Sequence, residues 1–281
     1  MPHLSQLQRD YKDKHVTIIG LTSEDRRNTL EMVKEMVEDK GDVMDFTVAW
    51  DTERKTNAAY MAASGQRGIP TSFLVDQSGN IAWIGHPMNV DIPLAMVVAG
   101  TWDYEDGPAM MKAIGEKRTA IYRAASTDPA KALALLSAFR DEYPVASKGM
   151  EGLEFSILCQ LPDHVAEAKK VGRVLVNEAI AEKNASALNA FAWPLVDPEE
   201  KRKDRFLELA MLAASKANEF SGNSDPAILD TLARVYFWQG DMQEALEIQR
   251  RAVEAAPEEM KASLQKAAEE YEGSVGNQRR R

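Results

Sequence analysis

The hydrophobic pattern of the first hundred residues predicts strands that alternate with helices. Val16–Leu21 is apolar and β-branched on both faces, which is typical of a buried strand in an α/β sheet. Residues 45–51 form a second predicted strand, and residues 71–76 and 81–85 form two more. The turn chemistry of residues 76–80, with Gly79 suited to a positive φ, joins the last two strands as an antiparallel hairpin.

Helices are predicted around these strands. Thr22 and Ser23 are candidate N-caps for the helix that follows the first strand, and a further helix is expected over residues 57–63. The apolar positions at helical spacing are Leu4, Leu7 and Tyr11 before the first strand and Leu30, Val33 and Val37 after it. The predicted order is therefore helix, strand, helix, strand, helix and hairpin. We expect Trp50, Phe73 and Trp83 to belong to the core of this sheet.

Beyond a predicted linker at residues 103–108 the pattern becomes helical throughout. β-branched runs disappear, and Ala, Leu, Glu and Lys dominate. Asp-Pro pairs supply a cap followed by proline at the first helical position. The predicted helix breaks fall at residues 127–129, 143–144, 161–163, 197–198, 225–226 and 256–257. We expect two domains, residues 1–103 and residues 104–281.

Internal repeats are the second feature of the helical half. The clearest unit spans residues 226–259, where Gly240 is expected to make the turn and Pro257 to end the second helix. The residues at tetratricopeptide spacing are Leu229, Leu232, Ala233, Tyr236, Gly240, Ala245, Ala252 and Pro257, whereas Gln249 departs from the pattern. A second unit with an insertion at 196–203 pairs residues 188–192 with 210–217. Such repeats predict an all-α solenoid, which either binds a protein partner or only stabilises its neighbour.

Composition narrows the classes of function. The formal net charge of −10 argues against phosphate contacts with nucleic acid, and the terminal run Arg279–Arg281 is too short to reverse it. No apolar run is long enough to span a membrane. The scattered histidines have no metal-ligand spacing, so neither a metal site nor another cofactor is predicted. Cys159 is the only cysteine, and its apolar surroundings predict a buried, unreactive thiol.

The string from Gly68 to Pro87, GIPTSFLVDQSGNIAWIGHP, resembles the cis-proline strand and hairpin of thioredoxin-like proteins. It is most similar to the TlpA-like and redoxin branch of thiol–disulfide oxidoreductases, which act in cell redox homeostasis. The resemblance covers about residues 1–103 and implies a thioredoxin-like fold. It also implies a cis Ile69–Pro70 bond and a peptide-binding loop at Gly68, Ile69, Pro70 and Thr71. In this family the residue before the proline, here Ile69, offers its backbone to an extended peptide.

The chain departs from this family at its catalytic element. The family's first core strand ends in a Cys-x-x-Cys at a helix N-terminus, and neither the strand nor the cysteine pair is present here. The redox reaction needs a thiolate and a resolving thiol, so we expect no catalytic residue and no disulfide reduction by this chain. The predicted thioredoxin-like domain is therefore incomplete, with a gap between the strands at 16–21 and 71–76.

Two explanations of this departure stay open. Either the start of the chain is assigned at an internal methionine, or the sequence encodes a non-catalytic remnant. No signal peptide is visible, so the chain as given is expected in the cytoplasm, whereas the resemblance implies an extracytoplasmic location if the true start lies upstream. The two functional hypotheses are an oxidoreductase-family protein with a repeat module, and a non-catalytic scaffold that binds peptides and proteins.

Overall fold

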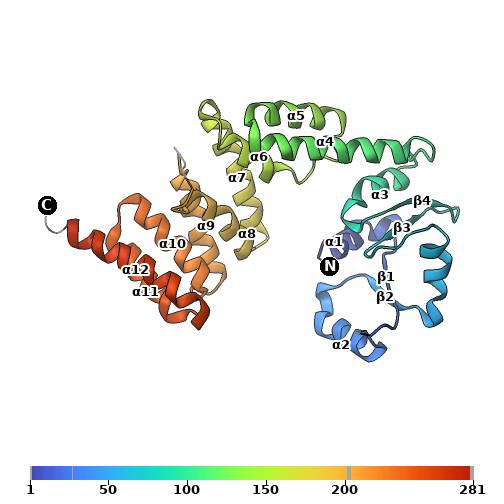
Figure 1. Cartoon of the computed structure of the whole chain (residues 1–281), viewed down its shortest axis with the longest axis horizontal. Coiled ribbons are helices and arrows are strands. Elements are labelled where there is room, and N and C mark those ends of the chain that lie inside the picture. Colours follow the sequence, from blue (N-terminus) through green and yellow to red (C-terminus); the bar gives the residue numbers. More distant parts are fainter. Residues whose placement is uncertain (1, 27, 201–203, 279–281) are drawn as a thin grey trace. The chain divides into compact units, whose positions relative to one another are not determined.

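The computed structural model describes residues 2–26, 28–200 and 204–278 (Figure 1). The chain forms two compact units, residues 1–116 and residues 117–281. The Arg279–Arg281 run and part of the expected insertion at 196–203 lie outside the described residues.

The first unit follows the predicted order of helices and strands. Its elements are α1 (Pro2–Asp10), β1 (Ile19–Thr22), α2 (Leu30–Lys40), β2 (Thr47–Trp50), a π-helical segment (Asn57–Ala62), β3 (Ser72–Val75), β4 (Ile81–Gly85) and α3 (Asp91–Val98). Short 3-10 turns lie at Lys12–Lys14, Gly41–Val43, Thr52–Arg54 and Pro87–Asn89.

The strands of this unit form two separate ribbons. β1 pairs in parallel with β2, and β3 pairs antiparallel with β4, which confirms the predicted hairpin. Among the described strands β1 and β3 do not pair with each other. The small sheet region is consistent with an incomplete thioredoxin-like domain, in which a gap separates these two strands.

Two sequence predictions about β1 and α2 were wrong in detail. β1 begins at Ile19 instead of Val16, because the amide of Gln8 in α1 pairs with the backbone ahead of the strand. Its Nε2 donates to the Val16 carbonyl (2.9 Å), and its Oε1 accepts from the Ile18 amide (2.6 Å). The N-cap of α2 is Thr29, whose side chain accepts from the Met32 amide, and not Thr22 or Ser23.

Two tryptophans form the core beside the hairpin. Trp83 and Trp102 are buried, whereas Trp50 and Phe73 are only half-buried. The indole of Trp102 lies so close to Gly107 that a Cβ there would stand 2.6 Å from the ring. The predicted linker at residues 103–108 forms a turn and the start of a helix. Asp103 accepts from the Glu105 and Asp106 amides, and Gly107 and Pro108 belong to the next helix.

The second half of the chain is helical. Its elements are α4 (Gly107–Thr127), which begins in the first unit, α5 (Pro129–Glu142), α6 (Glu151–Leu158), a 3-10 turn (Pro162–His164), α7 (Val165–Ala181), α8 (Ala185–Val196), α9 (Leu207–Phe220), α10 (Pro226–Gln239), α11 (Met242–Ala255) and α12 (Glu258–Gln278). From α5 to α12, each α-helix packs against the next α-helix along the chain. This arrangement is compatible with an all-α solenoid.

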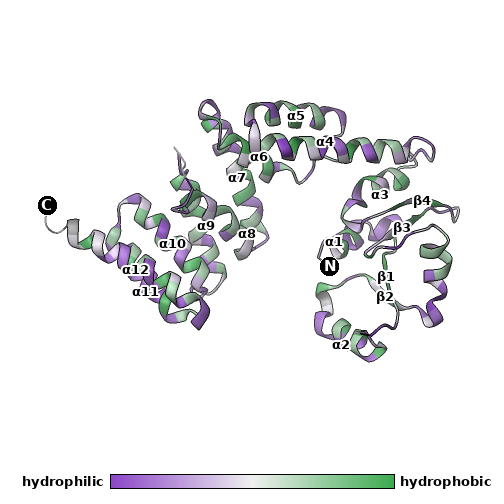
Figure 2. Ribbon diagram, in the orientation of Figure 1, coloured by the Kyte–Doolittle hydropathy of each residue, from purple (hydrophilic) through white to green (hydrophobic). Residues whose placement is uncertain are grey.

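Local capping explains where these helices start. Asp128 and Asp225 accept hydrogen bonds from the first helical turns of α5 and α10, each with proline at the first position. The third pair, Asp197-Pro198, was expected to start a helix in the same way, but Asp197 instead holds a turn by accepting from the Glu199 amide. Polar and apolar residues are interleaved along α7 to α12, as Figure 2 shows.

One core joins α6 to α12. Small residues fill its closest contacts, among them Ala210, Ala214 and Ala217 of α9 and Ala233, Ala245 and Ala252 of α10 and α11, all fully buried. Gly240 ends α10 at a φ of +90°, as predicted. Cys159 follows α6 and is half-buried against this core, not fully buried as expected. None of the described helices is long and apolar enough to cross a membrane.

Candidate functional site

The Gly68–Thr71 loop leads directly into β3. The peptide bond between Ile69 and Pro70 is cis. Ile69 is 87% exposed, the highest value among the exposed large hydrophobic residues that the structure describes. The loop therefore presents an exposed apolar side chain next to the start of β3, and peptide binding by strand addition uses the edge of such a strand.

Contacts within the loop and with the preceding helical segment fix its course. The Thr71 hydroxyl donates to the Gly68 carbonyl (2.6 Å). The ring of Phe73 in β3 meets the ring of Tyr60 edge to face, with centroids 5.2 Å apart. Gly68 has open space where a Cβ would stand, so no close approach of the chain's own backbone requires a glycine there.

Asp51 anchors the segment that carries Tyr60. Its carboxylate is buried, and its two oxygens accept from the Thr56 and Asn57 amides, both at 2.8 Å. Burial alone would raise the pKa of Asp51, but these hydrogen bonds to the charged form outweigh it and hold the pKa below its ordinary value. Asp51 thus acts as a structural cap at the end of β2.

No thiol belongs to this unit, because the single cysteine of the sequence is Cys159. Within residues 2–26, 28–200 and 204–278, no cluster of His, Cys, Asp or Glu side chains is arranged to hold a metal ion. The loop therefore offers backbone groups and apolar surface for binding, and it contains no nucleophile of the kind that the resemblance would require.

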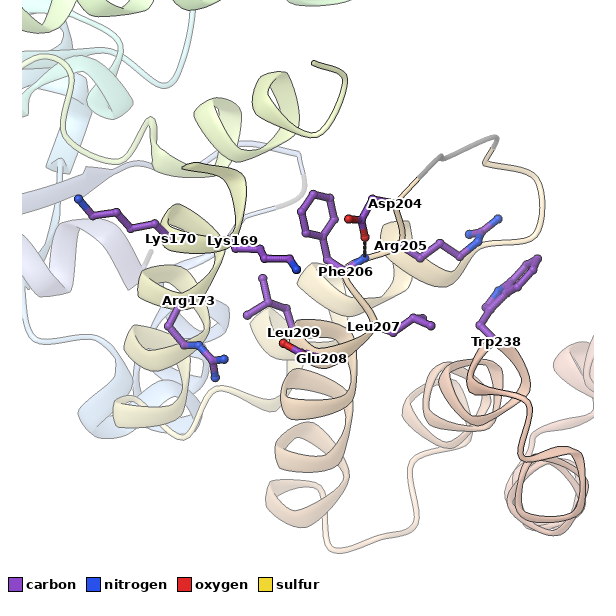
Figure 3. A pocket seen from close by; sticks show the side chains of 10 residues that line it. All are labelled: Lys169, Lys170, Arg173, Asp204, Arg205, Phe206, Leu207, Glu208, Leu209 and Trp238. Carbon is purple, nitrogen blue, oxygen red and sulfur yellow. Dashed lines mark hydrogen bonds between the residues drawn. The ribbon is translucent and has the colours of Figure 1, made fainter. Parts of the chain in front are cut away.

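A second candidate site lies in the helical unit, and it was not predicted from the sequence. Basic side chains of α7 and Arg205, which lies just ahead of α9, line an open pocket of about 600 Å³, with the indole of Trp238 in α10 at one side (Figure 3). We call this the cationic pocket. Its lining residues are Lys169, Lys170, Arg173, Asp204, Arg205, Phe206, Leu207, Glu208, Leu209 and Trp238.

The Arg205–Trp238 pair forms a fixed wall of the cationic pocket. The guanidinium of Arg205 stacks 3.9 Å from the centre of the Trp238 ring. Arg205 also donates to the carbonyls of Leu195, Asp197 and Glu200, at 2.9 to 3.1 Å. Trp238 donates from Nε1 to the Val196 carbonyl at 2.7 Å. Both side chains are therefore attached to the end of α8 and the segment after it.

Phe206 sets the start of α9 at this pocket. It is a buried, bulky residue with φ +45° and ψ +46°, a left-handed conformation that non-glycine residues rarely adopt. The Phe206 amide donates to the Asp204 carboxylate (2.8 Å). The centroids of the Phe206 and Phe155 rings are 5.9 Å apart. The basic spacing of Lys169, Lys170 and Arg173 was visible in the sequence, but Trp238 reaches the pocket only through folding.

Comparison with protein families gives a match within the first unit. The model of the AhpC/TSA family, whose members are thioredoxin-like redoxins, matches residues 1–84. This match covers less than a third of the 281 residues and includes the Gly68–Thr71 loop. No curated protein and no solved structure matched the chain significantly.

Proposed function

We propose that this chain is a thioredoxin-like protein of the TlpA/redoxin type, and that its Gly68–Thr71 loop binds extended peptide. The exposure of Ile69 at the entrance of β3 carries this proposal, because an extended ligand there gains main-chain hydrogen bonds and apolar contact together. The AhpC/TSA match over residues 1–84 supports it. The helical unit is proposed to be a tetratricopeptide-type module that binds a protein partner.

The chain itself is proposed to be inactive as a disulfide reductase. Cys159 is its only thiol, and reduction of a disulfide needs an attacking thiolate with a second thiol to resolve the mixed disulfide. We expect no turnover in an insulin-reduction assay with a thiol donor. Turnover that disappears in a Cys159→Ala variant would overturn this part of the proposal.

Peptide binding at the loop is tested with a labelled, extended apolar peptide. Ile69→Asp places a charge on the exposed side chain, so we expect peptide affinity to fall about tenfold, because the apolar contact is lost. Met32→Asp is the matched control, since Met32 is also an exposed apolar residue of this unit but lies on α2. Equal affinity of both variants would contradict a binding role for the loop.

A non-catalytic scaffold is the second candidate function. The absence of a cysteine pair from the sequence favours it, because binding by the loop needs no thiol. Both candidates predict that this chain reduces no disulfide, so the DNA upstream of the Met1 codon separates them. An in-frame segment that encodes a Cys-x-x-Cys would favour the oxidoreductase, and its absence would favour the scaffold.

A further inference from the structure

The cationic pocket carries charge opposite to that of the whole chain. Four of its lining residues are basic (Lys169, Lys170, Arg173 and Arg205) and two are acidic (Asp204 and Glu208), whereas the chain has a formal net charge of −10. A local concentration of positive charge attracts anionic groups, whereas the negative net charge of the chain disfavours their binding elsewhere.

Three of the basic side chains that line the cationic pocket lie on α7. Lys169, Lys170 and Arg173 form no hydrogen bond or ion pair with any other residue that the structure describes. Figure 3 shows Lys169 and Arg173 extending from α7 toward the start of α9, whereas Lys170 points outward. All three are exposed, so their donors are available to a ligand.

The opposite side of the cationic pocket contains the indole of Trp238 and the side chain of Leu207. Trp238 is 37% exposed, although its indole is already held by the hydrogen bond to Val196 and the stacked Arg205. Leu207, in the first turn of α9, is half-buried beside it in the pocket lining. Because the indole is held before a ligand arrives, little of its conformational entropy is lost on binding.

We propose that the cationic pocket binds an acidic peptide segment of a partner protein. Carboxylates of the segment pair with Lys169 and Arg173, and a neighbouring apolar side chain packs against Leu207 and Trp238. This proposal rests on the proposed protein-binding role of the helical unit and names the chemistry of its partner. The net charge of −10 favours a peptide over a nucleic acid, because a long polyanion is repelled by a negatively charged chain more strongly than a short acidic segment is.

The full-length chain is titrated into a short fluorescent peptide of Asp and Glu residues with one Leu, and into the same peptide with Asn and Gln in their place. We expect the acidic peptide to bind and the neutral peptide to bind about tenfold more weakly. Affinity should fall as salt rises, because a Debye length of about 8 Å at physiological ionic strength screens exposed charges.

The test variant is the double charge reversal Lys169→Glu and Arg173→Glu. We expect it to weaken binding of the acidic peptide by about tenfold or more. The control is Lys131→Glu with Lys266→Glu, two exposed lysines of the same unit outside the pocket, which change the net charge by the same amount. Circular dichroism of both variants checks that the helices are intact.

Three results overturn the inference. They are absence of acidic-peptide binding, equal loss of binding in the test and control variants, and displacement of the peptide by inorganic phosphate or an oligonucleotide at lower concentrations than by unlabelled acidic peptide. The Ile69→Asp variant tests the proposed loop function of the first unit separately. Binding of the apolar peptide that depends on Ile69, without binding of the acidic one, overturns only the inference.

Discussion

Gln249 donates a 2.7 Å hydrogen bond from Nε2 to Oδ1 of Asp230, and a second one of 3.1 Å to the Leu264 carbonyl. Its side chain is fully buried and joins α10, α11 and α12. This position departs from the tetratricopeptide pattern because it holds a buried polar residue. The two hydrogen bonds satisfy its Nε2 donors, whereas its buried Oε1 has no hydrogen-bond partner among the described residues.

Gln249→Ala is expected to destabilise the helical unit by about 1–3 kcal/mol, because Asp230 and the Leu264 carbonyl lose a donor inside the core. Urea unfolding followed by circular dichroism measures the change. Gln243→Ala, an exposed position of the same helix, is the control and should change the free energy of unfolding by less than about 0.5 kcal/mol. Equal stability of the two variants would contradict a structural role for Gln249.

Asp230 gives this interface a dependence on pH. Burial raises the pKa of Asp230, and the hydrogen bond from Gln249 and the charge of Arg234 oppose that rise only in part. The folded state therefore favours the neutral carboxyl. The contribution of protonated Asp230 to the stability of the fold is complete below the ordinary pKa of 3.8. This contribution is lost as the pH rises through the higher pKa of the folded state.

Asp230→Asn is therefore expected to be more stable than the unmodified chain at pH 7, with a difference that shrinks as the pH approaches 4. Urea unfolding of both proteins between pH 4 and pH 7 measures this difference. The opposite trend would be a stability of Asp230→Asn, relative to the unmodified chain, that is lower at pH 7 than at pH 4. That result would show that Arg234 determines the charge state of Asp230.

The sequence predicted helix limits better than it predicted polar contacts. Asp128 and Asp225 cap helices whose first turn follows them directly in the sequence. Because such a cap reaches only about three residues ahead, the sequence alone can predict it. The start of β1 depends instead on Gln8, which pairs with Val16 and Ile18 from another element. The cationic pocket escaped prediction for the same reason, since Arg205 and Trp238 are 33 positions apart in the sequence and meet only in the folded unit.

Gly172 tests the packing of α7. A Cβ at this buried glycine would stand 2.7 Å from the Phe155 ring and 2.9 Å from the Leu209 side chain. We expect Gly172→Ala to destabilise the unit by about 1–3 kcal/mol, since overpacking exceeds the gain in helix propensity. Gly152→Ala is the control: it meets open space on α6 and should stabilise by up to about 1 kcal/mol. Thermal unfolding of both variants gives the two signs, and stabilisation by both would show that Phe155 and Leu209 move aside freely.

The open edge of β1 predicts uneven stability between the two units. The Thr47 amide donates to the Ile18 carbonyl, and the Asp51 amide donates to the Thr22 carbonyl. The backbone N–H and C=O groups of the even-numbered residues therefore point toward β2. The backbone groups of Ile19 and Leu21 then point away from β2. Their side chains are 58% and 45% exposed, so little apolar burial holds this edge in place.

We therefore expect the amides of Ile19 and Leu21 to exchange with solvent at least about a hundredfold faster than those of Leu232 and Ala233, which lie in the core of α10. Hydrogen exchange of the monomeric chain, followed by mass spectrometry with fragments that separate residues 16–22 from 226–239, measures the ratio. The α10 amides report the stability of the helical core under identical conditions and so serve as the internal reference. Equally slow exchange in both segments would show that the first unit is stable without a further strand beside β1, and that a thioredoxin-like scaffold without its cysteine-bearing strand is a workable protein.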